Sequence, residues 1–472
     1  MAVSGTTATG KSETYTLNIN RWLDGASLTA FHWRLFALFV VLNAFDGYDL
    51  YVYSGTIPLI MKDFHINPIM AGAIASYMLM GSLVGALFLG TLTDKLGRKR
   101  ALVFFIALFS LGMFMVSRSS SPMMFAFWRF ITGVGVGGSQ PISTALCTEF
   151  SPRKNRGKIV STVHGGFSVG SVTAALAGIY LYAHYSWRSV YVLGSMTAFA
   201  LPLFILLLPE SPVRLMRSGK FEKVRALLRK IRPDQPVPAD CKLEIETGGG
   251  KAPVVEIFTE GRAKSTVLFW IVAFMNSYGL FGFATWLPKL IMGHGYPLAT
   301  GLTFMLAMAT TTISGSFIGG ALADKLGFKT ALVLFFLTSF TSITLVGFTG
   351  RYALLMPLVC LAGLGLYGAQ NLLNSYLPPF YPPSMRSTAT SVSFGLSRIG
   401  ALTGPVVIGA LLAASLSYQV TLICLASPVL ISAVCITLIQ EKYSFAKKIA
   451  ASEQSSAMLQ GTASSQPGLS AR

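Results

Sequence analysis

The sequence predicts an all-α membrane protein whose twelve transmembrane helices form two pseudo-symmetric six-helix bundles. Three observations support this fold class. The chain of 472 residues is 53% hydrophobic and only 12% charged, whereas soluble domains contain about 25% charged residues. Twelve apolar segments follow one another, most of them close to the ~20 residues that a helix needs to cross a bilayer. A short motif also recurs at equivalent places in the two halves.

A long polar insertion separates the first six apolar segments from the last six. It runs from Pro209 to Arg262 and includes an amphipathic stretch between Phe221 and Ile231. The predicted spans are 35–61, 69–92, 101–117, 122–148, 159–183, 188–208, 264–291, 298–322, 330–349, 352–376, 387–413 and 418–439. The predicted units are a cytoplasmic N-terminal tail (1–34), a first bundle (35–208), a cytoplasmic linker (209–263), a second bundle (264–440) and a disordered cytoplasmic tail (441–472).

The basic residues are distributed as in an inner-membrane protein. The formal net charge is +19, but the lysines and arginines gather in alternate loops between apolar spans, so nucleic acid is not an expected partner. They cluster at 95–100 and 153–158, whereas the loops on the other side carry roughly one each. Because basic loops stay in the cytoplasm, both termini are expected there. The first residues contain no apolar core of a signal peptide.

The repeated motif relates the two halves to each other. The sequence GTLTDKLGRK begins at Gly90, and the similar sequence GALADKLGFK begins at Gly320. Each copy lies between the second and third predicted spans of its half. Two bundles related in this way are typical of transporters that open alternately to the two sides of the membrane.

Two carboxylates lie in the middle of the first span. Asp46 and Asp49 are flanked by apolar residues on both sides, and an ionised side chain at the bilayer centre costs at least ~2.5 kcal/mol. Their spacing of three places both on one face of a helix, where a single polar pocket can serve both. We therefore expect a proton or substrate site here; the alternative is a helix-end pair exposed to lipid headgroups.

Three motifs resemble those of a known transporter family. The two GxxxDKxG loops resemble motif A of the major facilitator superfamily, although Phe328 replaces the basic Arg98 in the second copy. WRFITGVG at 128–135 resembles its RxxxGxG motif. DGYD at 46–49 resembles the DGxD signature of the aromatic acid:proton symporter family. Further similarities are EFSP at 149–152, RG at 156–157, PESP at 209–212, Arg386, and SR at 397–398.

This resemblance implies the major facilitator fold and the proton-coupled import of an aromatic carboxylate, such as benzoate or a hydroxybenzoate, across the bacterial inner membrane. It implies no cofactor, because the proton gradient drives transport, and we expect a monomer. One alternative is a proton-coupled transporter of another organic acid or a sugar. Another is a membrane sensor of aromatic acids, although neither the linker nor the C-terminal tail resembles an output module.

No enzymatic motif is present in the sequence. It contains no P-loop, no HExxH and no GxSxG nucleophile elbow. The five cysteines are not spaced as a metal site or a disulfide framework. The chain is therefore not expected to be an enzyme or to bind a metal ion.

Arg129 and Arg398 lie inside predicted spans. Arg398 is well inside the eleventh span, where a carboxylate partner would offset the cost of its charge. That partner is either the substrate or a carboxylate of another span, for instance Asp46 or Asp49. Arg129 lies nearer one end of the fourth span; it is either an arginine that extends to the interface or, as its motif implies, a proton-coupling element together with Asp46 and Asp49.

Polar and aromatic residues of the bundle interior are candidate substrate contacts. Gln370 and Asn374 share one helical face and suit a carboxylate or a ring hydroxyl, or else they join helices by hydrogen bonds. Further candidates in the seventh span and the first are Asn276, Trp286 and Tyr53, besides Asp49 and Arg398. Trp286 is otherwise a residue of the interfacial aromatic belt. His164, the one histidine inside a predicted span, lies in a glycine-rich stretch that favours close helix packing over proton relay.

Five charged residues are expected to control the conformational change. The resemblance assigns the motif A loops, and hence Asp94, Arg98 and Asp324, to conformational switching without substrate contact. Arg386, which precedes the eleventh span, is expected to act in the same way. Glu149 forms either a gating ion pair or an ordinary cluster of charges at a helix end.

Overall fold

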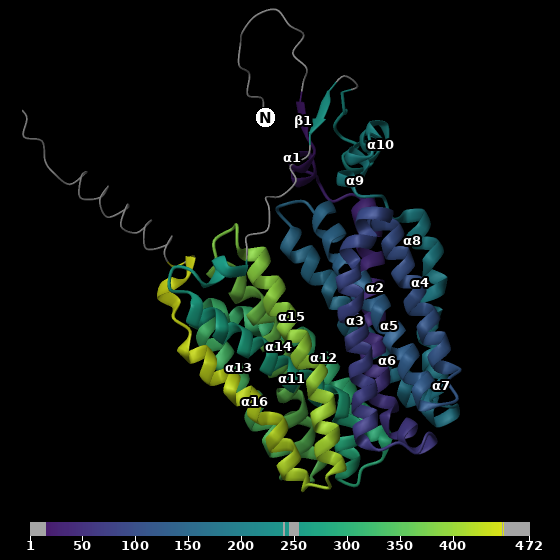
Figure 1. The fold of residues 1–472 in the computed structure, drawn as a ribbon, viewed down its shortest axis with the longest axis vertical. Coiled ribbons are helices and arrows are strands. Elements are labelled where there is room, and N and C mark those ends of the chain that lie inside the picture. Colours follow the sequence, from purple (N-terminus) through teal and green to yellow (C-terminus); the bar gives the residue numbers. More distant parts are fainter. Residues whose placement is uncertain (1–15, 239–240, 245–253, 446, 448–472) are drawn as a thin grey trace, which may run out of the picture.

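The structure is a computed structural model, and it describes residues 16–238, 241–244, 254–445 and 447. The side chains of Thr91, Asp94, Ile313 and Ser316 lie outside this description. Most of the described chain is helical, and the long helices run roughly parallel in two groups (Figure 1).

The first bundle consists of six spans. They are α2 (Ala30–Asp63), α3 (Pro68–Leu96), α4 (Arg98–Ser117), α5 (Pro122–Phe150), α6 (Arg156–His184) and a broken sixth span made of α7 (Arg188–Ser195), η1 (Met196–Ala200) and α8 (Leu201–Leu207). The first span begins earlier than the sequence predicts, at Ala30. The reason is a local cap, in which the Thr29 backbone N–H donates to Nδ1 of His32 over 3.1 Å.

The second bundle repeats this arrangement. Its helices are α11 (Ala263–Gly293), α12 (Leu298–Leu326), α13 (Phe328–Val346), α14 (Tyr352–Phe380), α15 (Arg386–Ala413) and α16 (Tyr418–Leu438). The helices α12 and α14 begin and end 230 residues after α3 and α5, and the same offset separates Gly90 from Gly320. The turns after α3 and α12 match as well, since Gly97 and Gly327 have φ of 86° and 82°. The predicted pair of pseudo-symmetric six-helix bundles is confirmed.

Most of these helices are apolar enough to cross a membrane. Within the described residues, ten pass by length and composition, and α12 is an eleventh when its two parts are taken as one span. The remaining long helix, α5, is less apolar because it carries several glycines and the polar residues Arg129, Gln140 and Glu149. These polar residues belong to the candidate site described below.

Glycines let the helices within each bundle approach closely. A Cβ on Gly170 of α6 would lie 1.7 Å from the carbonyl oxygen of Ala44 in α2. At the equivalent place in the second bundle, a Cβ on Gly400 would lie 2.1 Å from the carbonyl oxygen of Phe274. His164 takes no part in this packing, because it is exposed. The glycines, and not the histidine, therefore set the spacing of α2 and α6.

Alanine at Gly170 should destabilise the fold strongly. Its Cβ would overlap backbone atoms that cannot move without separating α2 from α6, at a cost of about 3 kcal/mol. Gly165 on the same helix is the matched control, since a Cβ there meets nothing within 4 Å. The two alanine variants are purified in detergent and heated, and size-exclusion chromatography detects unfolding. This gives the difference between their melting temperatures. Equal melting temperatures would contradict the close packing of α2 and α6.

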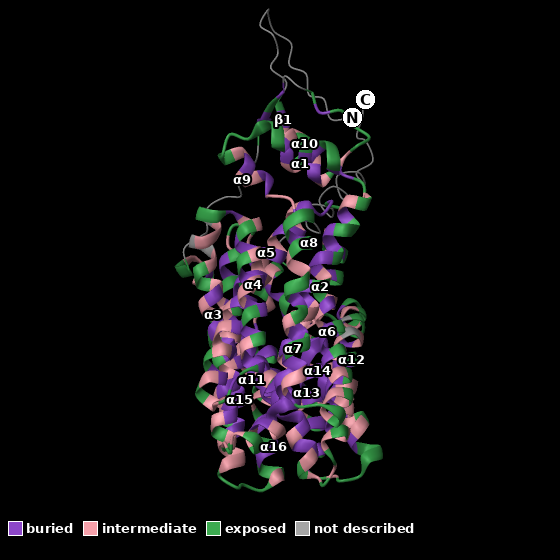
Figure 2. Ribbon diagram, turned by 90° about the vertical axis from the view of Figure 1, so that its right-hand side faces the viewer, coloured by how far each residue is buried: buried purple, intermediate pink, exposed green. Residues whose placement is uncertain are grey.

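The two bundles meet in the half of the molecule that lies away from the linker (Figure 1). The Ser54 hydroxyl of α2 donates to the carbonyl of Ala284 in α11 over 2.6 Å. The Ser76 hydroxyl of α3 donates to the carbonyl of Leu402 in α15 over 2.5 Å. All four residues lie in the helix halves remote from the linker. Figure 2 shows buried residues along the middle of the bundles and exposed ones on their outer faces.

The half nearer the linker is open. Phe394 of α15 is 48% exposed, and a Cβ added to the neighbouring Gly395, like one added to Gly165 of α6, would meet nothing within 4 Å. In Figure 1 the bundles diverge toward the end that carries α9 and α10. The structure is therefore closed on the side remote from the linker and open on the linker side.

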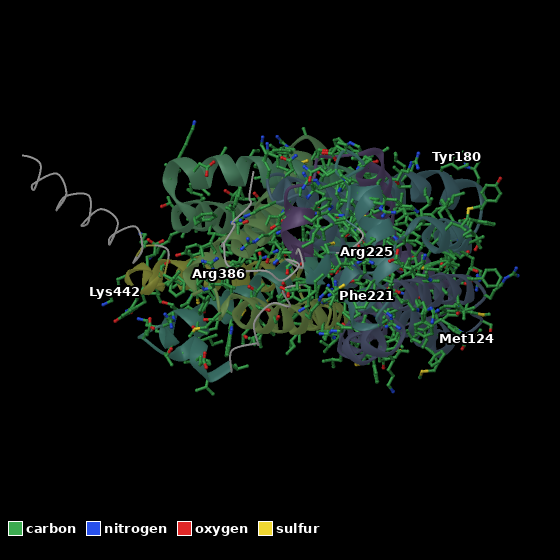
Figure 3. All side chains as sticks on the ribbon, turned by 90° about the horizontal axis from the view of Figure 1, so that it is seen from above. Met124, Tyr180, Phe221, Arg225, Arg386 and Lys442 are labelled. Atoms are coloured by element: carbon green, nitrogen blue, oxygen red, sulfur yellow. The ribbon has the colours of Figure 1, made fainter. Side chains whose placement is uncertain are left out.

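The linker and the N-terminal segment pack together above the first bundle. The linker contains α9 (Pro212–Arg217), α10 (Phe221–Ile231), β2 (Lys242–Glu244) and η2 (Val254–Phe258), and the N-terminal segment contains β1 (Thr16–Asn18) and α1 (Ile19–Asp24). β1 and β2 pair in parallel, with Leu17 opposite Leu243. Figure 3, seen from the linker side, places Phe221 and Arg225 of α10 over the first bundle.

This region differs from the polar N-terminal tail expected from the sequence. Leu17, Ile19 and Leu23 are buried in one apolar cluster with Val224 and Leu228 of the linker helix α10, and burial of such side chains stabilises the segment. Residues 1–15 of the expected tail lie outside the described residues, as do 448–472 of the expected C-terminal tail. The described start of that C-terminal segment contains η3 (Glu441–Tyr443).

Candidate functional site

A buried ion pair lies inside the first bundle. Arg129 of α5 donates to Asp49 of α2, and the two side chains are 1% and 0% exposed. The guanidinium of Arg129 also lies over the ring of Tyr53, 4.9 Å from its centre, and the Tyr53 hydroxyl donates to the carbonyl of Ala71 over 2.6 Å. Tyr53 is thus placed to hold the arginine by a cation–π contact.

Each member of this pair keeps one polar atom without a partner. Among the described side chains, Oδ2 of Asp49 and Nε of Arg129 are buried and have no hydrogen-bond partner. Buried polar atoms are usually paired, so an unpaired one needs a reason. Protonation of this carboxylate would remove the cost of burying its negative charge and would weaken the bond to the arginine.

Asp46 has a different environment from Asp49. The side-chain N–H of Gln140 in α5 donates to Oδ2 of Asp46 over 2.9 Å. The same amide accepts a hydrogen bond at its oxygen from Arg398 of α15 over 3.1 Å. Asp46, Gln140 and Arg398 therefore form a chain of hydrogen bonds from the first bundle to the second. The two carboxylates share a helical face, as the spacing indicates, but bond to different partners.

The second bundle contains an amide pair at the equivalent positions. The offset that relates the two motif A loops places Asn276 opposite Asp46 and Gln370 opposite Gln140. The Asn276 side-chain N–H donates to the oxygen of Gln370 over 2.8 Å, and the Gln370 N–H donates to Asn374 over 3.4 Å. Three predicted polar contacts thus lie in one network.

This network borders a pocket between α11, α14 and α15. The residues that line it are Ala273, Gln370, Leu373, Asn374, Leu377, Thr390, Ser393, Phe394 and Ser397. The guanidinium of Arg398 lies 4.8 Å from the ring centre of Phe394. Among the described residues, no carboxylate lies within ion-pair distance of Arg398. The pocket thus offers an aromatic ring, amides and hydroxyls next to a cation whose charge is not paired directly.

Trp286 lies elsewhere. Its indole N–H donates to the carbonyl of Pro405 in α15 over 2.9 Å, and its ring lies 3.1 Å from the position of a Cβ on Gly409. The residue is fully buried and does not line the pocket described above. In this structure Trp286 joins α11 to α15 on the side where the bundles are closed, and it does not lie in an interfacial belt.

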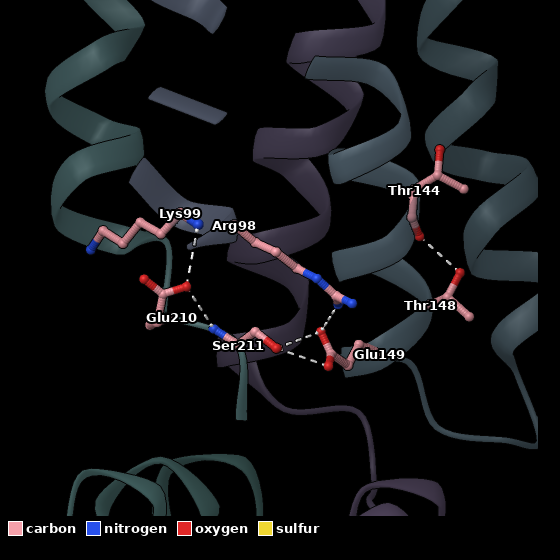
Figure 4. A network of polar contacts seen from close by, with 7 residues as sticks. All are labelled: Arg98, Lys99, Thr144, Thr148, Glu149, Glu210 and Ser211. Carbon is pink, nitrogen blue, oxygen red and sulfur yellow. Dashed lines mark hydrogen bonds and ion pairs between the residues drawn. The ribbon is translucent and has the colours of Figure 1, made fainter. Parts of the chain in front are cut away.

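The gating candidates of the first bundle form a network at the linker side (Figure 4). Arg98, at the start of α4, pairs with Glu149 near the end of α5 over 2.6 Å. The hydroxyl of Ser211, just before α9, donates to both oxygens of Glu149 over 2.9 and 3.1 Å. The backbone N–H of Lys99 donates to the carboxylate of Glu210 over 3.4 Å. Glu149 thus joins the motif A loop, α5 and the beginning of the linker.

The remaining gating candidates are arranged differently. Nε of Arg386, labelled in Figure 3, donates to the carbonyl of Tyr381 over 3.1 Å. Its counterpart Arg156 makes the same contact to Ser151 over 3.3 Å and also pairs with Asp24 over 2.5 Å. Asp324 is exposed. The side chain of Asp94 lies outside the described residues.

Sequence reasoning missed Gln140, although a signal was available. The internal repeat aligns it with Gln370, a residue that the sequence does single out. No group of three or more metal-ligating side chains is found among the described residues.

Comparisons with known proteins identify the family. The model of the Major Facilitator Superfamily matches residues 39–405 and 307–469. The chain is 34% identical to the benzoate transport protein of Acinetobacter baylyi, over 90% of this chain and 93% of the relative. It is 28% identical to the 4-hydroxybenzoate transporter PcaK of Pseudomonas aeruginosa (89% and 95%) and 27% identical to the gallate transporter of Pseudomonas putida (89% and 94%).

Solved structures share the fold at low sequence identity. The inward open conformation of the xylose transporter XylE from E. coli superposes with a TM-score of 0.68 at 16% identity, over 86% of this chain and 96% of that one. An inward-facing bacterial homologue of the lysosomal transporter Spinster gives 0.67 at 14% identity, over 89% and 99%. The two six-helix bundles, the family model and the relatives agree: the chain belongs to the major facilitator superfamily, and within it to the family of aromatic acid transporters.

Proposed function

We propose that this protein imports an aromatic carboxylate together with a proton across a bacterial inner membrane, with both termini in the cytoplasm. The observation that carries the proposal is the juxtaposition of Arg398 with the ring of Phe394 and an amide-lined pocket beside it. Named relatives that transport benzoate, 4-hydroxybenzoate and gallate support the same class of substrate.

The side chains of the proposed substrate site suit a flat anion. The guanidinium of Arg398 suits a carboxylate, since its planar fork binds two oxygens at once. Phe394 offers a face for ring stacking, and Gln370, Asn374 and Ser393 offer hydrogen bonds to ring substituents. Most pockets for small ligands combine such an apolar wall with a few placed polar groups.

Proton coupling involves the buried carboxylates of α2. Asp49 shares its charge with Arg129 and has one free oxygen, and Asp46 is linked to the substrate site through Gln140. One proton and one monoanion enter together, so the bundles carry no extra net charge when they rock. Because the open side is the linker side, this structure corresponds to the state that releases substrate into the cytoplasm.

Uptake of radiolabelled benzoate and 4-hydroxybenzoate into cells that express the chain tests this function. We expect saturable uptake that collapses when a protonophore removes the gradient. Asp49→Asn serves as the matched inactive variant, with its membrane level checked by immunoblot. Uptake of neither acid, or uptake unaffected by the protonophore, would overturn the proposal. Competition by xylose but not by benzoate would indicate a sugar substrate.

The ion pair between Arg98 and Glu149 is proposed to set the rate of the conformational change. Glu149→Ala should slow uptake about fivefold, because a partly exposed pair contributes at most about 1 kcal/mol. The reversed pair, Arg98→Glu with Glu149→Arg, should recover part of the rate. Glu222→Ala is the control, since Glu222 pairs with Arg225 within α10 and its own side chain is 83% exposed. A Glu149→Ala variant with normal initial rates would contradict the role.

A further inference from the structure

Gln140 makes a polar contact between the two bundles near the proposed substrate site. It donates to Asp46 over 2.9 Å and accepts from Arg398 over 3.1 Å. A glutamine side chain has one donor end and one acceptor end, and these can be exchanged by rotating the amide. The direction of the amide therefore depends on whether its neighbour offers a donor or an acceptor.

An ionised Asp46 fixes that direction. A carboxylate only accepts hydrogen bonds, so the NH2 group of Gln140 must face Asp46 and its oxygen must face α15. Arg398 only donates, and it finds this oxygen. In this arrangement, the amide of Gln140 occupies a donor of Arg398 that a substrate carboxylate would otherwise use.

The second bundle shows the opposite arrangement at the equivalent positions. There Asn276 replaces the carboxylate, and its NH2 group donates to the oxygen of Gln370 over 2.8 Å. Asparagine has the shape of a protonated aspartic acid and, like it, offers a donor. Gln370 turns its oxygen toward this donor and its own NH2 group away, toward Asn374 at 3.4 Å. In the first bundle the glutamine faces a carboxylate, and in the second bundle the equivalent glutamine faces a neutral donor.

We infer that Gln140 is a positioning residue whose amide rotates when Asp46 takes up a proton and so releases Arg398 for the substrate. This rests on the proposed function. The proton comes from water in the open cavity and binds a carboxylate oxygen of Asp46. The new O–H donates to the oxygen of Gln140, and the NH2 group then faces Arg398, which cannot accept it. Arg398 and this NH2 group can now both donate to an incoming carboxylate.

Two charged groups act electrostatically on Asp46, namely Asp49 on α2 and Arg398 on α15. The other charged and titratable groups on α2 and on the elements near it are Tyr48 on α2, Arg129 on α5, His164 and Tyr182 on α6, Tyr191 on α7 and Tyr367 on α14. α11 carries the neutral Asn276 at the equivalent register. His164 is the one histidine among these groups, and it lies 3.4 Å from Thr144. Because histidine itself titrates near neutral pH, a His164→Gln variant shows whether the pH dependence of binding comes from this residue.

The test is the pH dependence of benzoate and 4-hydroxybenzoate binding to the purified full-length protein, by calorimetry from about pH 5.5 to about pH 8.5. When binding requires one proton, affinity falls about tenfold per pH unit above the pKa of the coupling group. Leucine is similar in size to glutamine, but its side chain has no donor or acceptor, so Gln140→Leu cannot couple the protonation of Asp46 to Arg398. We expect it to bind with nearly constant affinity over the whole range. Asp46→Asn should do the same, and the double variant should equal the single ones.

The outcomes separate this inference from the proposed function. A native protein that binds neither acid at any pH refutes the substrate class, whatever Gln140 does. Native binding combined with an unchanged pH dependence in Gln140→Leu overturns the inference, as does loss of all binding in that variant. A flattened dependence in His164→Gln overturns it as well. If the leucine variant elutes as an aggregate, Gln140→Met is judged by the same criteria.

Discussion

Leucine at Arg129 should abolish concentrative uptake and lower the free energy of unfolding by about 3–5 kcal/mol. The reason is the burial of its partner. Asp49 is 0% exposed, and without the guanidinium its charge is left uncompensated in a medium of low dielectric constant. Purified variants measured by thermal unfolding, and cells measured by uptake of labelled benzoate, give the two effects separately.

The double variant distinguishes an ion pair from simple loss of packing. Asp49→Asn combined with Arg129→Leu removes both charges, so stability should recover much of the loss while uptake stays absent. Arg118→Leu is the surface control, because Arg118 is exposed at the end of α4. Additive losses in the double variant would mean that the two residues contribute independently to stability, contrary to the pairing in the structure.

Glutamine at Arg398 should weaken binding of the aromatic acid by roughly 10- to 150-fold, which corresponds to about 1.5–3 kcal/mol for a hydrogen bond to a charged group. Arg398→Ala should abolish uptake altogether while the protein remains in the membrane. Lysine should restore only part of the affinity, because it lacks the planar pair of donors. Equilibrium binding of benzoate measures all three variants.

Arg351→Gln provides the matched control for this series. It removes an arginine from an exposed position between α13 and α14, and affinity should stay unchanged. If Arg398→Gln bound benzoate as tightly as the native protein, the carboxylate would have to be held elsewhere in the cavity. In that case the assignment of the pocket beside Phe394 would be wrong.

The fold class could be predicted from the sequence because it depends on features that need no knowledge of tertiary contacts. Hydropathy finds the spans because a lipid-exposed helix must be apolar over its whole length, and the recurrence at Gly90 and Gly320 reveals the two halves. The sequence could not say which arginine meets which carboxylate. Asp46 and Asp49 share a helical face, and only the rotation and packing of α2, α5 and α15 decide that Arg129 reaches one and Gln140 the other.

The contact between the N-terminal segment and the linker could not be predicted either. β1 and β2 are three residues each and lie far apart in the chain, so no local periodicity announces their pairing. The apolar residues Leu17 and Ile19 look like isolated members of a polar tail until α10 covers them. Gln140, by contrast, could have been found from the repeat, because its counterpart Gln370 already stood out.

The constant offset between the bundles points to descent from one duplicated ancestor whose copies later specialised. The positions of Asp49 and Arg129 are occupied by Gly279 and Val359 in the second copy, and the position of Arg398 is occupied by Ser168 in the first. Under the proposed function, the charges for energy coupling lie in the first copy and the charge for cargo recognition lies in the second. A chimaera that joins this first half to the second half of a relative should therefore inherit the relative's cargo but keep its own driving force.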